Sequence, residues 1–162
     1  DYSHIEQLGR AITRLSSLDI SNCSFNPVSL ATFAASVTWA EAALTSLNCS
    51  GNAIGESGAQ TLIKIIESSE SLQFIVVGHP LPLKEPYVSN ALDVSKKGLT
   101  PGDAIILAWW MKTPFSAVLA SVNVLKNPIG DDGLAALAAA VEASSVGSIC
   151  GIVEGQLSLI HI

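Results

Sequence analysis

Residues 44–59 read LTSLNCSGNAIGESGA, and residues 119–134 repeat them slot for slot as LASVNVLKNPIGDDGL. Both follow the pattern L-x-x-L-x-L-x-x-N-x-I-G-x-x-G, with Cys49 and Val124 in the third apolar slot. Residues 15–25 (LSSLDISNCSF) are a third copy with Cys23 in the Asn slot, and residues 92–99 (LDVSKKGL) are a fourth with Lys97 there. Self-similarity at a fixed period indicates a repeat architecture.

The second apolar slot recurs at positions 18, 47, 75, 92, 122 and 149, where position 75 belongs to a degenerate copy and 149 opens another. Four of the five steps between these positions lie between 27 and 30 residues. The 17-residue step from Ile75 to Leu92 is the exception, and it carries a proline-rich insert at 79–90. The sequence therefore predicts a single domain over 1–162 with about five to six repeats.

The second half of each repeat predicts a helix. Ten residues after the third slot, apolar residues follow at intervals of three and four, which places them on one face of a helix. Each unit is therefore a strand, a turn and a helix, and such a unit must stack on its neighbours to bury its apolar face. The four series are Leu30, Phe33 and Val37; Ala59, Leu62 and Ile66; Ala104, Leu107 and Met111; and Leu134, Leu137 and Val141.

Turn chemistry fits the same pattern. We expect the Asn52 and Asn127 amides to satisfy backbone groups where the chain leaves each strand. Gly55 and Gly130 suit a turn with positive φ, where a residue without a Cβ meets no steric cost.

The motif and its period resemble the leucine-rich-repeat superfamily in its ribonuclease-inhibitor-like class. Residues 92–104 (LDVSKKGLTPGDA) and 149–152 (ICGI) also resemble long multi-repeat leucine-rich-repeat proteins of protists. The resemblance implies an α/β solenoid, a horseshoe with parallel strands on its concave face and helices on its convex face. The chain begins at Asp1 and ends on an apolar tail, so we expect it to be part of a longer protein.

Composition excludes several functions. The net charge is −6 and only Lys96 and Lys97 are adjacent among eight basic residues, so no basic stripe predicts nucleic-acid binding. No window reaches the roughly 20 apolar residues of a transmembrane helix. Three widely spaced cysteines favour an intracellular reducing compartment, the cytoplasm or an organelle, over secretion. No catalytic motif, metal-ligand spacing or cofactor motif is present, so the sequence predicts no enzyme, no metal and no cofactor.

The first candidate site is the predicted concave face. Its residues are small and polar, without the Trp, Tyr and Arg that dominate binding hot spots. This composition predicts weak binding. The residues are Ser17, Asp19, Ser21, Ser46, Asn48, Ser50, Asp93, Ser95, Ser121 and Asn123.

The second candidate site is a convex apolar patch on the helix at 103–112, formed by Ile105, Ile106, Trp109 and Trp110. A helix that is apolar all round is normally covered on both sides. Two explanations are open: the patch contacts a partner protein, with a membrane surface as the weaker alternative, or the insert at 79–90 or flanking sequence covers the rings.

The sequence thus predicts a non-enzymatic protein-interaction module, a structural or accessory subunit of a larger assembly. Low charge and the all-round apolar helix favour permanent contacts, since obligate interfaces are the more hydrophobic ones. The alternative is a regulatory module that is attached to, or controls, an enzyme or GTPase.

Overall fold

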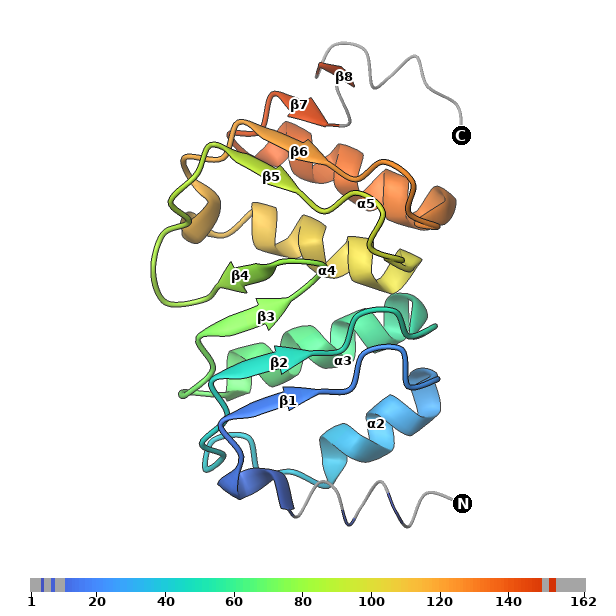
Figure 1. Ribbon diagram of the computed structural model, residues 1–162, viewed down its shortest axis with the longest axis vertical. Coiled ribbons are helices and arrows are strands. Elements are labelled where there is room, and N and C mark those ends of the chain that lie inside the picture. The colour runs from blue at the N-terminus through green and yellow to red at the C-terminus, as the bar shows by residue number, and fades with distance from the viewer. Residues whose placement is uncertain (1–3, 5–6, 8–10, 150–151, 154–162) are drawn as a thin grey trace.

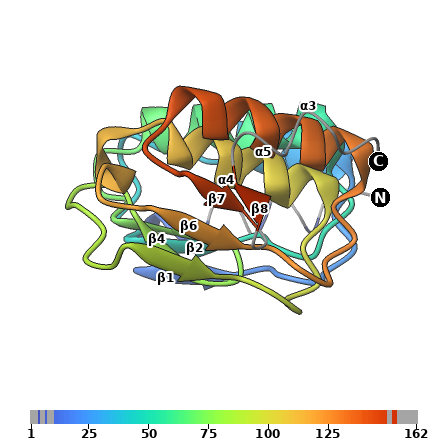
Figure 2. The same cartoon turned by 90° about the horizontal axis from the view of Figure 1, so that it is seen from above.

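The computed structural model describes His4, Gln7, residues 11–149 and residues 152–153, which form a mixed α/β fold. Figures 1 and 2 show the strands in one layer and the helices in a second layer that covers one side of them. In chain order the elements are η1 (Ile12–Arg14), β1 (Ser17–Asp19), α2 (Pro27–Ala35), β2 (Ser46–Asn48), α3 (Gly55–Ser68), β3 (Phe74–Val76), β4 (Pro80–Pro82), β5 (Ala91–Asp93), α4 (Pro101–Met111), η2 (Pro114–Ser116), β6 (Ser121–Asn123), α5 (Gly130–Ala143), β7 (Ser148–Ile149) and β8 (Ile152–Val153).

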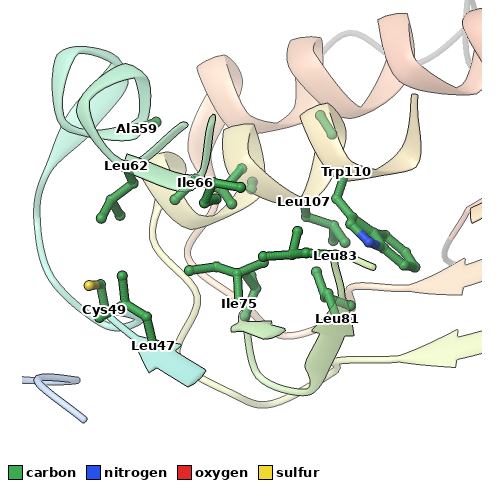
Figure 3. Close-up of a cluster of buried hydrophobic side chains, with 14 of the residues drawn as sticks. Leu47, Cys49, Ala59, Leu62, Ile66, Ile75, Leu81, Leu83, Leu107 and Trp110 are labelled. Atoms are coloured by element: carbon green, nitrogen blue, oxygen red, sulfur yellow. The ribbon is translucent and has the colours of Figure 1, made fainter. Parts of the chain in front are cut away.

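The repeated apolar slot lies in a strand in every repeat, as the sequence predicts. Each of these six side chains is at most 9% exposed, and together with the helix residues of the same pattern they form one core between the two layers. The exception is Leu134, which was predicted to face the core and is only half-buried. Figure 3 shows part of this core, with Leu47 and Ile75 of the strands facing Leu62 and Leu107 of the helices. The six slot residues are Leu18, Leu47, Ile75, Leu92, Val122 and Ile149.

The predicted α/β class with parallel strands is confirmed, whereas the predicted solenoid horseshoe stays a prediction. The strands form two four-stranded sheets, in the orders β1-β2-β3-β4 and β5-β6-β7-β8. In each sheet the first three strands are parallel and the fourth turns back antiparallel. The strand β4 was not expected, because proline is poorly suited to a sheet interior.

Proline explains why the first sheet ends at β4. Ladder bonds run from Val77 N–H to His79 O and from Leu83 N–H to Gln73 O. The backbone groups of Pro80 and Pro82, which alternate with these residues, therefore point away from β3. Prolines have no N–H to donate to a further strand. The outward carbonyls are also engaged: Trp110 Nε1 donates to Pro82 O at 2.9 Å, and His79 Nδ1 lies 2.9 Å from Pro80 O. The edge of β4 therefore offers β5 nothing to pair with.

Asn52 and Asn127 satisfy backbone groups where the chain leaves each strand, as predicted, and the same bonds join two neighbouring repeats. Asn52 accepts hydrogen bonds from Cys23 N–H and Phe25 N–H at 3.0 Å, and its amide group donates to Ile20 O and Cys49 O. Asn127 makes the equivalent bonds to residues 97, 99, 94 and 124. The predicted positive φ is also confirmed, at +62° for Gly55 and +64° for Gly130.

The two halves of the chain are copies of each other at a spacing of 74 to 75 residues. The elements β1, α2, β2, α3 and β3 correspond to β5, α4, β6, α5 and β7. Capping boxes begin both α2 (Asn26 with Ser29) and α4 (Thr100 with Asp103). Left-handed residues recur in the same places, including 22 with 96 and 51 with 126. Two strand–turn–helix repeats and a closing hairpin therefore form one larger unit.

Candidate interaction surface

The outward-pointing side chains of the parallel strands form what we call the strand face. Strand register aligns Ser17 with Ser46 and Asp19 with Asn48 in the first sheet, and aligns Asp93 with Asn123 in the second. The structure thus brings the predicted concave-face residues together, but in two groups separated by β4 and the insert. Ser21, Ser50 and Ser95 follow their strands directly, and Ser121 belongs to the second group.

Most of these polar side chains close their own turns. Asp19 Oδ1 accepts from both the N–H and the hydroxyl of Ser21, at 2.9 and 2.6 Å. Asn48 with Ser50 and Asp93 with Ser95 repeat this arrangement at almost the same distances. A binding surface of such groups would have to compete with bonds that they already make.

These bonds also fix the charge of the two acids. Hydrogen bonds from the Ser21 hydroxyl and N–H hold the pKa of Asp19 below its usual value. The Ser95 hydroxyl and N–H do the same for the pKa of Asp93, with help from Lys97 and Lys96. Both carboxylates are therefore charged near neutral pH.

An apolar region interrupts this polar surface at β3. Phe74 stands in register with Ser46, and Val76 with Asn48, so phenylalanine and valine replace serine and asparagine. The antiparallel partners directly opposite are Pro82 and Pro80, which lie on the same face because paired residues share a side of the sheet. Phe74 is 39% exposed.

A pocket of about 410 Å³, which we call the insert pocket, opens over this apolar region. The ring of Tyr87 lies edge-on to His79 (centroids 5.9 Å apart) and to Trp110 (5.7 Å). Tyr87 N–H donates to Phe115 O at 2.8 Å, which ties the insert to the chain after α4. The pocket is lined by Gln73, Phe74, His79, Pro80, Pro82, Lys84, Glu85, Pro86, Tyr87 and Val88.

The insert pocket was not predicted, although the sequence contains one signal for it. At the position of Phe74, four of the five other parallel strands carry serine (17, 46, 121 and 148), and the fifth carries Ala91. A bulky aromatic residue in a slot of small residues marks a place where the surface is used differently.

The predicted convex patch is not an exposed surface. Ile106 is 1% exposed and Trp110 is fully buried, while Ile105 and Trp109 are half-buried. Gly102 lies directly against Ile54 at the start of α3, and Ile106 stands one turn further along the same side of α4. Neighbouring helices therefore cover part of the face that the sequence predicted to lie on the convex surface.

The insert covers Trp110, as the second explanation held. Its indole Nε1 donates to Pro82 O and its ring meets Tyr87, so this tryptophan joins the insert to the core. A function for Ile105 and Trp109 at the surface stays a prediction.

Two other hollows are shallower. One of about 520 Å³ lies over the second sheet and is lined by Asp93, Ser121 and Asn123 among others. One of about 320 Å³ lies between α2 and α3 beside Trp39 and Lys64. Neither contains an exposed aromatic cluster like that of the insert pocket.

The described residues offer few groups that could bind a metal or act as a nucleophile. Across the residues that the structure describes, no three His, Cys, Asp or Glu side chains are grouped to hold a metal ion. Cys49 is buried in the core, and burial followed by the nearby Asp103 charge raises the pKa of its thiol. Of the helices in these same ranges, none has both the length and the apolar character to cross a membrane.

Comparison with known proteins agrees with the repeat. The family model described as a leucine-rich repeat matches residues 117–138, which contain β6 and the first part of α5. The structure titled Leiomodin-1 Actin-Binding Site 2 is similar at 7% identity and a TM-score of 0.44, over 90% of this chain and 75% of that one. No curated protein matches the chain in sequence. The repeat match supports the leucine-rich-repeat superfamily and a role in protein interaction, while the ribonuclease-inhibitor-like class stays a prediction.

Proposed function

We propose that this chain is a non-enzymatic protein-interaction module of the leucine-rich-repeat solenoid type, and that it holds a partner protein on its strand face. The observation that carries the proposal is the insert pocket, an aromatic and proline-lined hollow set into an otherwise small and polar surface. Such a hollow accepts an apolar side chain of the partner, and the polar strands on either side contact the surrounding residues.

Energetics favour the pocket as the anchor. Hot spots are buried aromatic contacts near the centre of an interface, surrounded by contacts of little energy. Phe74 and Tyr87 supply aromatic surface. Phe74 is fixed in its strand, where its N–H donates to Thr45 O, and Tyr87 is fixed by its ring contact with Trp110 and its bond to Phe115 O. Little ordering entropy is then lost on binding, because the pocket is formed before the partner arrives.

The hypothesis of a permanent assembly subunit depended on the low charge of the chain and on the all-round apolar helix, which is α4. Since Ile106 and Trp110 are part of the core, the helix face gives this hypothesis less support than the sequence suggested. We therefore favour the strand face as the binding surface. A binding surface there suits either an accessory subunit or the alternative, a regulatory module beside an enzyme or GTPase.

The experiment compares partner capture by the wild-type chain and by Phe74→Ser. Serine stands at the matching position of β1, β2 and β6, so the substitution gives β3 a side chain that its neighbours already carry. The matched control is Val28→Ser on α2, which removes a 60% exposed valine from the helix side. Partners are quantified by mass spectrometry after a high-salt wash, which screens surface charge contacts but leaves apolar contacts in place.

We expect a hot-spot residue of this kind to be worth about 2 kcal/mol, or about a thirtyfold loss of affinity. Partners should therefore be lost from Phe74→Ser and retained by Val28→Ser. Equal retention by both variants would remove the insert pocket from the proposal.

A further inference from the structure

The contact between α3 and α4 shows how one 74-residue unit receives the next. Ile54, at the start of α3, is fully buried between Gly58 of its own helix and Gly102 of α4. A Cβ on Gly102 would lie 2.6 Å from Ile54 Cγ1 and 2.9 Å from Gly55 O, closer than real contacts allow. Only glycine at this position lets the first turn of α4 approach α3.

Hydrogen bonds fix the same contact. Asp103 Oδ2 accepts from Gly51 N–H at 2.8 Å, across 52 residues of sequence, and Thr100 Oγ1 donates to Asn52 O at 3.1 Å. Asp103 is 1% exposed, so this bond is well shielded from water. The first turn of α4, with the sequence Thr-Pro-Gly-Asp (residues 100–103), is thus the docking element.

The helix α5 carries the counterpart of the surface that α3 presents to α4. Its positions 129, 134 and 138 correspond to 54, 59 and 63 of the first unit. Ile54 and Ala59 are fully buried and Ile63 is 7% exposed, whereas Ile129, Leu134 and Ala138 are all half-buried. The backbone is the same in both places, since φ is +62° at Gly55 and +64° at Gly130.

The two helices carry the same combination of one large and one small side chain at these positions, in the opposite order. The pair Ala59 and Ile63 on α3 becomes Leu134 and Ala138 on α5, so a large residue remains at one of the two positions. Ile129 lies against Gly133 much as Ile54 lies against Gly58. Among the described glycines, only Gly133 of the same helix lies against Ile129, and no glycine of another helix approaches it as Gly102 approaches Ile54.

We propose that this face of α5, formed by Ile129, Leu134 and Ala138, is a docking surface for a further leucine-rich-repeat unit of this chain's own kind. Its occupant is a helix that begins with Pro-Gly-Asp. The glycine leaves room for Ile129, as Gly102 does for Ile54, and the aspartate can accept a hydrogen bond from the turn that precedes the docking helix, as Asp103 does from Gly51. The surface is distinct from the insert pocket, so the proposal goes beyond the proposed function.

The same geometry excludes a second copy of the chain that would dock through its first helix. In a second copy the matching helix is α2, which has Val28 where α4 has Gly102 and Ser29 where α4 has Asp103. A valine side chain cannot fit where even a single Cβ would lie too close.

The test is a three-unit protein in which a second copy of residues 75–148 is inserted after Ser148. Ile75 then stands in the place of Ile149, and Gly102 of the inserted copy meets Ile129 of the original unit. Urea unfolding is followed by circular dichroism and tryptophan fluorescence. We expect one cooperative transition, with a midpoint above that of the natural chain and a steeper urea dependence, because more surface is buried.

The decisive variant is Gly102→Val in the inserted copy alone, which reproduces the residue found in α2. It should split the transition in two, with the inserted unit unfolding at lower urea. A three-unit protein that already unfolds in two steps would overturn the proposal, and so would one that Gly102→Val leaves unchanged.

Discussion

Asparagines 52 and 127 make the same hydrogen bonds in different surroundings, so replacing each by alanine isolates the effect of burial. Asn52 is 1% exposed, and its removal leaves two N–H groups and two carbonyls without a partner inside the protein. At about 1 kcal/mol for each lost bond, Asn52→Ala should cost about 4 kcal/mol. That is a large part of the roughly 5–15 kcal/mol that holds a domain folded.

Asn127 is only half-buried, so water can replace part of what the alanine variant loses. We therefore expect Asn127→Ala to cost about half as much, about 2 kcal/mol. The free energy of unfolding of each variant is measured by urea titration at constant slope. Equal costs for the two variants, or a larger cost at Asn127, would refute the reasoning that shielding from water sets the strength of these bonds.

Three further predictions concern the core. Trp110→Phe should lower the free energy of unfolding by about 1–3 kcal/mol in urea titration, because it leaves the buried Pro82 carbonyl without its indole donor; no loss would contradict that role. Burial raises the pKa of the Asp103 carboxyl above its ordinary 3.8, so its charged form weakens the fold. As the pH falls from neutral towards 3.8, the free energy of unfolding of wild type should therefore rise relative to that of Asp103→Asn. A relative fall over this pH range would contradict the raised pKa. In the native protein a thiol reagent should label exposed Cys23 and spare buried Cys49, as mapped by mass spectrometry; rapid labelling of Cys49 would mean that its part of the core opens.

The repeat and its core were predictable because they depend on periodicity. Apolar slots spaced by two residues in the strands and by three or four in the helices decide which side of each element faces the core. The roles of Asn52 and Gly55 also follow from residue type, since an amide can both donate and accept and glycine tolerates positive φ.

The break in the sheet and the insert pocket were not predictable in the same way. The strand β4 forms where prolines argue against a strand, because its ladder bonds fall on His79 and Leu83 instead. The burial of Ile106 depends on the approach of α3 at Gly102, which is a contact between segments about 48 residues apart. A helical wheel treats a helix alone and cannot include that neighbour.

Site-specific photo-crosslinking tests most directly the claim that the strand face holds the partner. A photoreactive amino acid is placed either at Val88, which is 96% exposed beside the insert pocket, or at Val28, which is 60% exposed on the helix side. The account predicts a crosslinked partner from position 88, lost when Phe74→Ser is added, and none from position 28. A partner crosslinked from position 28 but not from position 88 would contradict it.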